Sequence, residues 1–217
     1  MEQRKLILTA SLPFPLGLVS RPVQRLAGVS HRPRWSRDDS LPCTRTRQYG
    51  ASMDSDDVHV APSGGPLVDL GGLGVQFKVP GEQTGGRFAV VEHPMQPGIL
   101  VDPHIHHNED ELSYVLEGAI WARVGDREVE AAAGSYVWKP RGVLHTFWNP
   151  GPDSARILEV ISPAGFEHLF EEVAALMEHP SDTTEEEVYE LCRHYGLTFD
   201  RSWLPDIESR FGPMRIV

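Results

Sequence analysis

The chain has 217 residues, with 20 Lys and Arg against 31 Asp and Glu and a formal net charge of −11 at pH 7. This length suits one well-buried domain with appendages rather than two full domains. The acidic balance argues against nucleic-acid binding by the folded part, because a phosphate backbone would be repelled.

The first 52 residues differ in composition from the rest. They hold nine Lys and Arg against three Asp and Glu and show no sustained hydrophobic period, so we expect a disordered basic extension over residues 1–52. Its apolar run, residues 6–20, contains prolines and is shorter than the about 20 residues of a membrane-spanning helix. The extension also resembles a secretory signal or a transit peptide. Alternatively, Met53 is the natural start and the upstream residues are a gene-start artefact.

Short strand-like runs follow from about residue 67 to residue 163. Turn signals such as GG, PG, EG, GD and NPG separate these runs, and no helical pattern lies between them. Regular spacing of this kind predicts an all-β sandwich or barrel. The predicted strands are VQFKV (75–79), RFAVVEH (87–93), ELSYVL (111–116), IWARV (120–124), SYVWK (135–139), HTFWN (145–149) and RILEVI (156–161).

The pattern changes to that of helices near residue 166. Apolar side chains recur at helical spacing in residues 165–179, and a second helix is predicted within residues 183–196. Thr183 stands three positions before Glu186, which predicts a capping box at the start of that helix. Residues 166–217 are thus expected to form a helical segment that packs on the outside of the sheets or forms a dimer interface.

Only two cysteines occur in the chain, Cys43 and Cys192. They are too few for a disulfide framework, which favours a reducing compartment and a cytoplasmic location. Cys192 lies on the apolar face of the second predicted helix, so we expect it to be a buried side chain.

Residues 104–111 read HIHHNEDE and crowd histidines and carboxylates together. One interpretation is a solvated surface loop. The other is part of a metal site, because His104 and His106 would project to the same face of a strand. Glu109, Asp110 and Glu111 compete for the role of a third ligand. Glu111 is favoured, because it begins the next predicted strand and is held more rigidly than a turn residue.

His145 begins a later predicted strand and is the candidate fourth ligand. If its strand faces residues 104–106 across a barrel, three imidazoles and one carboxylate meet around a cation. Such mixed nitrogen and oxygen ligation suits Fe, Mn, Co, Ni, Cu or Zn rather than Mg or Ca. A divalent ion and one glutamate would give the site a charge of about +1, with one or two positions open for exchange.

Two spaced patterns resemble the paired signatures of the cupin superfamily. The first is G-x5-H-I-H-x4-E-x6-G from Gly98 to Gly118, and the second is G-x5-P-R-G-x2-H-x3-N from Gly134 to Asn149. The resemblance implies a cupin-type jelly-roll β-barrel over residues 53–165, with C-terminal α-helices after it. It also implies a divalent transition metal held by His104, His106, Glu111 and His145.

The wider stretch is similar to quercetin 2,3-dioxygenase-type cupins. This resemblance implies a metal-dependent oxidoreductase that acts on an aromatic or enol-type chelating small molecule. Glu111 would then double as a catalytic proton acceptor. Two alternatives remain open: a non-catalytic module that binds or senses a small molecule, and an isomerase or lyase that uses the metal without O2. A homodimer is a further expectation from the resemblance.

Several other side chains have less specific patterns. Ser113 shares a strand face with Glu111 and could orient a ligand or the carboxylate. The aromatic residues could line a pocket or fill the core; they are Phe88, Tyr136, Trp138 and Phe147. Four other histidines show no spacing signal and are expected at the surface; they are His93, His168, His179 and His194.

Overall fold

The computed structural model describes residues 58–178 and 183–217. The basic extension predicted for residues 1–52 lies outside the described residues, as do Cys43 and His179. Among the helices of the described residues, none is both long and apolar enough to cross a membrane.

A six-stranded sheet forms one wall of the fold. Its neighbours are antiparallel, and the order is β1-β2-β3-β11-β6-β9. The strands are β1 (Leu67–Asp69), β2 (Gly74–Val79), β3 (Ala89–Met95), β11 (Ala155–Ser162), β6 (Asp110–Glu117) and β9 (Tyr136–Lys139).

A seven-stranded sheet forms the other wall. Its main order is β12-β5-β10-β4-β13, and β7 joins it by pairing with both β10 and β8. The strands are β12 (Leu197–Phe199), β5 (His104–His106), β10 (His145–Asn149), β4 (Ile99–Leu100), β13 (Arg215–Ile216), β7 (Ala119–Val124) and β8 (Arg127–Ala132).

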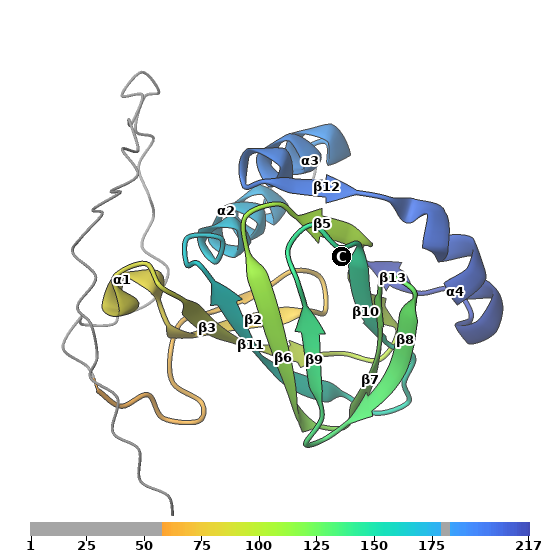
Figure 1. Ribbon diagram of the computed structural model, residues 1–217, viewed down its shortest axis with the longest axis horizontal. Helices are drawn as coiled ribbons and strands as arrows, with labels where there is room; N and C mark the ends of the chain where they lie inside the picture. Colours follow the sequence, from red (N-terminus) through yellow and green to blue (C-terminus); the bar gives the residue numbers. More distant parts are fainter. Residues whose placement is uncertain (1–57, 179–182) are drawn as a thin grey trace, which may run out of the picture. The chain divides into compact units, whose positions relative to one another are not determined.

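The two sheets curve around a common apolar interior (Figure 1). Strand β11 alternates strictly between buried and half-buried positions, and Ile157 and Ile161 on its inner face are fully buried. Full burial of such a side chain stabilises the fold by about 1.5–3 kcal/mol. This alternation in long strands, with almost no helix inserted, is the physical basis of the predicted jelly-roll barrel, which the structure confirms.

The seven predicted strands coincide with observed strands to within two residues at each end. Strand β8 was missed because its sequence, REVEAA, is rich in residues with low β-propensity. Its position is set by the tight turn after β7, where Gly125 has a φ of 53° that a side chain would disfavour.

Two helices of the C-terminal segment lie within the ranges that the pattern predicted. They are α2 (His168–Met177) and α3 (Glu185–His194). Three shorter helices were not predicted: η1 (Arg201–Trp203) and α4 (Leu204–Phe211) in the same segment, and α1 (Gly81–Thr84) between β2 and β3. The predicted capping box is wrong by one residue. Thr184 caps Glu187, because the helix starts at Glu185, and Thr183 instead donates a hydrogen bond to the carbonyl of Leu176 at 2.9 Å.

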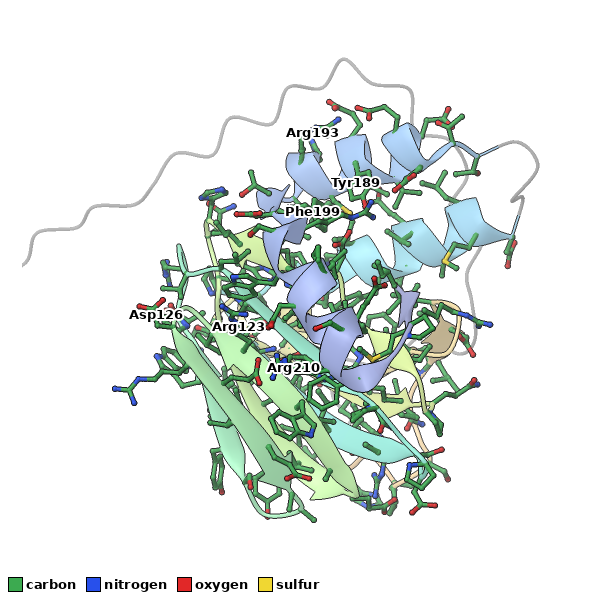
Figure 2. All side chains as sticks on the ribbon, turned by 90° about the vertical axis from the view of Figure 1, so that its right-hand side faces the viewer. Arg123, Asp126, Tyr189, Arg193, Phe199 and Arg210 are labelled. Atoms are coloured by element: carbon green, nitrogen blue, oxygen red, sulfur yellow. The ribbon has the colours of Figure 1, made fainter. Side chains whose placement is uncertain are left out.

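Helices α2 and α3 and strand β12 lie together at one end of the barrel (Figure 1). Their apolar faces join the main core, and Cys192 is buried there as predicted. Tyr189 of α3 and Phe199 of β12 lie together, with ring centroids 4.7 Å apart (Figure 2). Residues 166–217 therefore supply two strands of the barrel, β12 and β13, as well as helices.

Candidate metal centre

Three short elements bring the sequence-predicted ligands together. His104 and His106 point inward from the two ends of β5, which lies between β12 and β10 in its sheet. His145, at the start of β10, pairs directly with His104. Glu111 projects from β6 of the opposite sheet. All four side chains are buried, with at most 7% of each residue exposed.

Each imidazole has its Nδ1 atom next to an acceptor. The carbonyl of Asp102 lies 2.7 Å from Nδ1 of His104, and the carbonyl of Val143 lies 3.0 Å from Nδ1 of His145. For His106 the acceptor is a carboxylate oxygen of Glu109 at 3.3 Å. Nδ1 must carry the proton to donate to these acceptors, so each neutral ring turns an unprotonated Nε2 toward the others.

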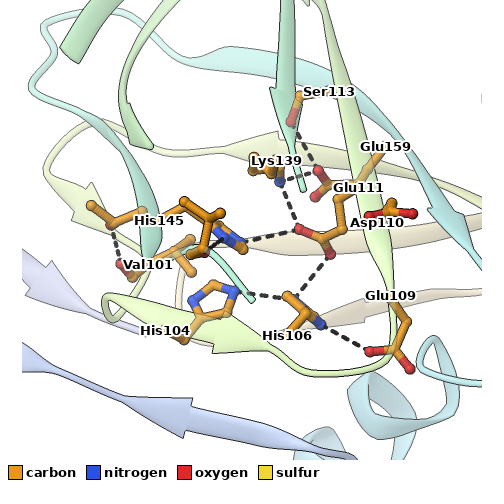
Figure 3. A network of polar contacts seen from close by, with 12 residues as sticks. Val101, His104, His106, Glu109, Asp110, Glu111, Ser113, Lys139, His145 and Glu159 are labelled. Atoms are coloured by element: carbon orange, nitrogen blue, oxygen red, sulfur yellow. Dashed lines mark hydrogen bonds and ion pairs between the residues drawn. The ribbon is translucent and has the colours of Figure 1, made fainter. Parts of the chain in front are cut away.

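The Nε2 atoms and the Glu111 carboxylate then meet in one small volume (Figure 3). Nε2 of His104 and Nε2 of His106 are 3.2 Å apart, and Glu111 oxygens lie 3.2 Å from Nε2 of His106 and 3.4 Å from Nε2 of His145. The ligand atoms of the four residues all lie within 4.8 Å of one another. Nε2 of His145 is buried and finds no hydrogen-bond partner in residues 58–178 and 183–217.

Electron pairs without protons between them repel, and an unsatisfied buried nitrogen is costly. A cation removes both penalties, so the donor set fits a metal ion. Three nitrogens and one carboxylate form a mixed set that suits divalent transition metals such as Fe, Mn, Co, Ni, Cu or Zn. The hydrogen bonds to Nδ1 are the outer contacts that usually orient metal-bound histidines.

The electrostatics of the group keep it ready for a cation. Burial and the neighbouring His145 and His106 hold the pKa of His104 well below 6.5, so its ring stays neutral at neutral pH. Burial raises the pKa of Glu111, but its neighbours, among them the cationic Lys139, outweigh burial and hold that pKa well below 4.5. Glu111 is therefore ionised.

The other carboxylates of the HIHHNEDE stretch have different partners. Glu109 is buried and orients His106 as described above. Asp110 accepts hydrogen bonds from the backbone and the guanidinium of Arg141, at 2.9 and 2.6 Å. Of the three competing acidic residues, only Glu111 lies beside the Nε2 atoms of the imidazoles. His107 points away and its Nε2 lies 3.0 Å from the hydroxyl of Thr198.

A second buried polar group adjoins the first, and the sequence analysis missed it. Lys139 on β9 is 2.9 Å from Glu111 and also bonds Glu159 on β11. Glu159 accepts a hydrogen bond from Ser113 at 2.8 Å and lies 3.4 Å from Nε2 of His93. The expectation that His93 is a surface residue was wrong, because it sits at an inward position of β3 and is 1% exposed.

The strand alternation contained the signal for this second group. Lys139 is two positions after the buried Val137 and therefore shares its inward face, although lysine is usually exposed. Ser113 faces inward, as predicted, but it bonds Glu159 rather than Glu111.

A cavity of about 570 Å³ opens onto both polar groups. The polar residues that line it include His104, His106, Glu111, His93 and Glu159. Most other lining side chains are apolar, and they come from the barrel, from α2 and α3 and from the C-terminal strands; examples are Val101, Phe147, Phe166, Phe170, Val188 and Phe199.

The aromatic residues divide between the two sides of the barrel wall. Phe147 is buried and lines the cavity. Phe88, Tyr136 and Trp138 are 37%, 70% and 55% exposed, so the expectation that they line a pocket or fill the core was wrong. Tyr136 and Trp138 alternate with the inward Val137, and the phase of the strand therefore turns both outward.

Comparison with known proteins agrees with the geometry of the site and the fold. Residues 92–161, which include all four clustered side chains, match the family model described as the Cupin domain. Residues 92–161 therefore carry a cupin domain.

The relatives of this cupin differ in kind. The HTH-type transcriptional regulator PuuR of Escherichia coli (strain K12) is 26% identical over 166 residues, which cover 69% of this chain and 90% of the regulator. Quercetin 2,3-dioxygenase of Aspergillus japonicus is 34% identical over 102 residues, 44% of this chain and 29% of that enzyme. An RmlC-like cupin structure from Shewanella frigidimarina NCIMB 400 has a TM-score of 0.44 and 21% identity, over 52% of this chain and 96% of that one. Because relatives include a regulator and an enzyme, function has to be argued from the site.

Proposed function

We propose that this cupin is a metal-dependent oxidoreductase acting on an aromatic or enol-type chelating small molecule. The observation that carries the proposal is the position of the His104, His106, Glu111 and His145 group, which borders a largely apolar cavity of about 570 Å³. A ligand that fits such a cavity needs an apolar body and a few polar atoms directed at the metal group. The 34% identity with a quercetin 2,3-dioxygenase over 102 residues supports the same reaction class.

The protein's own residues would perform three tasks. The three imidazoles and Glu111 would hold a divalent transition metal, which supplies Lewis-acid and oxygen-binding chemistry when it is bound. Phe147, Phe166 and Phe170 would hold a flat ligand and exclude water from it. Glu111, which is ionised, would accept a proton from the hydroxyl group of the ligand.

Metal analysis of the purified protein and oxygen-uptake assays with flavonols, catechols and keto acids test the proposal. Substrate-dependent oxygen uptake that needs the metal is the expected result. Product formation without oxygen would replace the oxidoreductase with an isomerase or lyase, and a protein that holds no transition metal would refute the proposal.

The proton-acceptor role of Glu111 has its own test. Glu111→Gln should lower turnover far more than it lowers the free energy of unfolding. Glu117→Gln is the matched control on the same strand, because its side chain is 65% exposed and pairs with Arg156. Equal losses of turnover and stability in Glu111→Gln would contradict the proposed role.

A second candidate is a non-catalytic module that binds or senses a small molecule through the same metal. The match to 90% of a transcriptional regulator favours it. Tight binding of a chelating ligand without any turnover would support this candidate over the enzyme.

Three other sequence-based predictions are also kept as proposals. The barrel would be built mainly from residues 53–165, and residues 166–217 would be a largely helical segment that adds β12 and β13 to it. The protein would form a homodimer, and it would act in the cytoplasm. Light scattering of the purified protein would test the homodimer.

A further inference from the structure

Lys139 is a buried cation at the edge of the proposed metal centre. It lies directly opposite Glu111 in the antiparallel pairing of β9 with β6, and it is 1% exposed. Its Nζ is 2.9 Å from Oε2 of Glu111 and 4.9 Å from the centre of the Phe147 ring. A lysine is almost never buried without a paired anion, so this position requires a reason.

Glu159 fixes the ammonium group from the other side. Its Oε1 bonds Nζ of Lys139 and accepts a hydrogen bond from the hydroxyl of Ser113 at 2.8 Å. Its Oε2 lies 3.4 Å from Nε2 of His93, whose Nδ1 lies 3.0 Å from the carbonyl of Gly74. The position of Lys139 is therefore set by side chains from three neighbouring strands of one sheet.

The contact makes the two oxygens of Glu111 unequal. Oε2 accepts from Lys139 and lies 3.4 Å from Nε2 of His145, whereas Oε1 lies 3.2 Å from Nε2 of His106 and does not bond Lys139 (Figure 3). A hydrogen bond to a charged donor is both short and strong, so it restrains rotation of the carboxylate. Oε1 keeps its electron pairs available on the side of the imidazoles.

We propose that Lys139 is a positioning residue that holds Glu111 as a ligand through one oxygen, and that Glu159 is the anchor of Lys139. This inference rests on the proposed function, because it assumes that the four-residue group binds a metal. Outer contacts of this kind typically change metal affinity by about 10–100-fold when they are lost. Lys139 thus contributes to the affinity and geometry of the centre and not only to the stability of the barrel.

The contrasting possibility is that Lys139 only balances the charge of two buried carboxylates. Both roles lower stability when Lys139 is replaced, so stability alone does not distinguish them. The affinity for a metal and the absorption spectrum of bound cobalt do, because they report on the position of Glu111.

The experiment compares Lys139→Met with Lys78→Met, and it uses Co²⁺ as the probe. Lys78 is a matched control: it is 7% exposed on β2, and its Nζ bonds the carbonyls of Pro62 and Gly64 at 2.7 and 3.0 Å. Cobalt affinity is measured by calorimetry, the ligand field by visible absorption, and unfolding by urea in the metal-free protein. We expect Lys139→Met to weaken cobalt binding by about 10–100-fold and to change the spectrum, and Lys78→Met to change neither.

A double variant keeps the test decisive if Lys139→Met folds poorly. Lys139→Met with Glu159→Gln removes the cation and one of the two anions, so its stability should be closer to that of the wild type. Its cobalt affinity should stay as low as that of Lys139→Met. Recovery of affinity together with stability would overturn the positioning role, as would unchanged affinity in Lys139→Met.

The proposed function and the positioning role of Lys139 would be overturned by different results. Absence of cobalt binding by the wild-type protein would overturn the proposed metal-dependent function and this inference with it. Normal cobalt binding in the Lys139 variants would overturn the inference alone.

Discussion

Replacing His145 by leucine should separate metal binding from folding. Nε2 of His145 is buried and lacks a hydrogen-bond partner in the described part of the chain, and Nδ1 lies 3.0 Å from the carbonyl of Val143. Removing an unsatisfied buried polar atom relieves about 1–3 kcal/mol, and losing an ordinary hydrogen bond costs about 0.5–1.5 kcal/mol. Leucine is similar in size to histidine, so the metal-free variant should unfold with a free energy equal to that of the wild type or about 1 kcal/mol higher.

With metal present, the free energy of unfolding of His145→Leu should be lower than that of the wild type. Metal at about 1,000 times its dissociation constant stabilises the wild type by about 4 kcal/mol. Loss of an outer contact weakens metal binding by up to about 100-fold, and loss of a direct ligand should weaken it by at least as much. At the same metal concentration the variant then gains only about 1.4 kcal/mol. At about 2–4 °C per kcal/mol for a domain of this size, the metal-induced shift in Tm should fall from about 8–16 °C to about 3–6 °C.

Thermal and urea unfolding, with chelator and with added Zn²⁺ or Co²⁺, provide the measurement. His107→Leu is the control, because His107 is exposed and bonds Thr198 outside the four-residue group. A metal-free His145→Leu protein that is more than about 2 kcal/mol less stable would refute the reasoning, since Nε2 would then have a stabilising partner. An unchanged metal-induced shift would refute the ligand assignment.

Three further predictions concern the stability of the protein. The pKa of His104 is held well below 6.5, so below about pH 6.5 the unfolded chain binds a proton at this histidine and the folded chain does not. The free energy of unfolding of the metal-free protein should therefore fall as pH drops below about 6.5. The lowered pKa of Glu111 should add a second loss below about 4.5, because that carboxylate is stabilised only while it is ionised; a urea midpoint that stays constant from pH 7 to pH 4 would contradict both. Thr184→Ala removes the N-cap of α3 and should cost about 1 kcal/mol in urea unfolding while zinc affinity measured by calorimetry stays the same. Glu167→Gln should cost about 1–3 kcal/mol in the same urea assay, because the two oxygens of the buried Glu167 accept the backbone N–H groups of Gly81 and Gly165, at 2.8 and 2.6 Å, and a glutamine offers only one acceptor oxygen. An unchanged midpoint would show that one of the two bonds is dispensable.

The sequence predicted the barrel and the four clustered side chains because both follow from the spacing of residues within short segments of the chain. Alternation with period 2 follows from strand geometry alone, so residues 111–116 and 145–149 were recognisable as strands without a partner. Two histidines separated by one residue share a face for the same reason. His145 begins a later strand, 34 positions beyond Glu111, and the resemblance to paired cupin signatures supported its assignment as the fourth ligand.

The spacing of residues could not predict which side chains surround those four. Lys139, Glu159 and His93 come from three strands, and their ion pairs exist only because the sheet order places β9 next to β6 and β6 next to β11. Strand β12 has only three residues and no pattern of its own, yet it pairs with β5 and so helps to hold His104 and His106.

The chain alone therefore determined which groups can donate electron pairs and on which face of each strand they lie, because backbone geometry repeats every two residues. Only the tertiary structure decided which ring nitrogen of each histidine carries the proton. The acceptors beside Nδ1 of His104 and His145 are backbone carbonyls, which every sequence contains, and their direction is set by the packed barrel. That direction leaves the Nε2 atoms unprotonated, and this is the physical reason why the centre suits a cation.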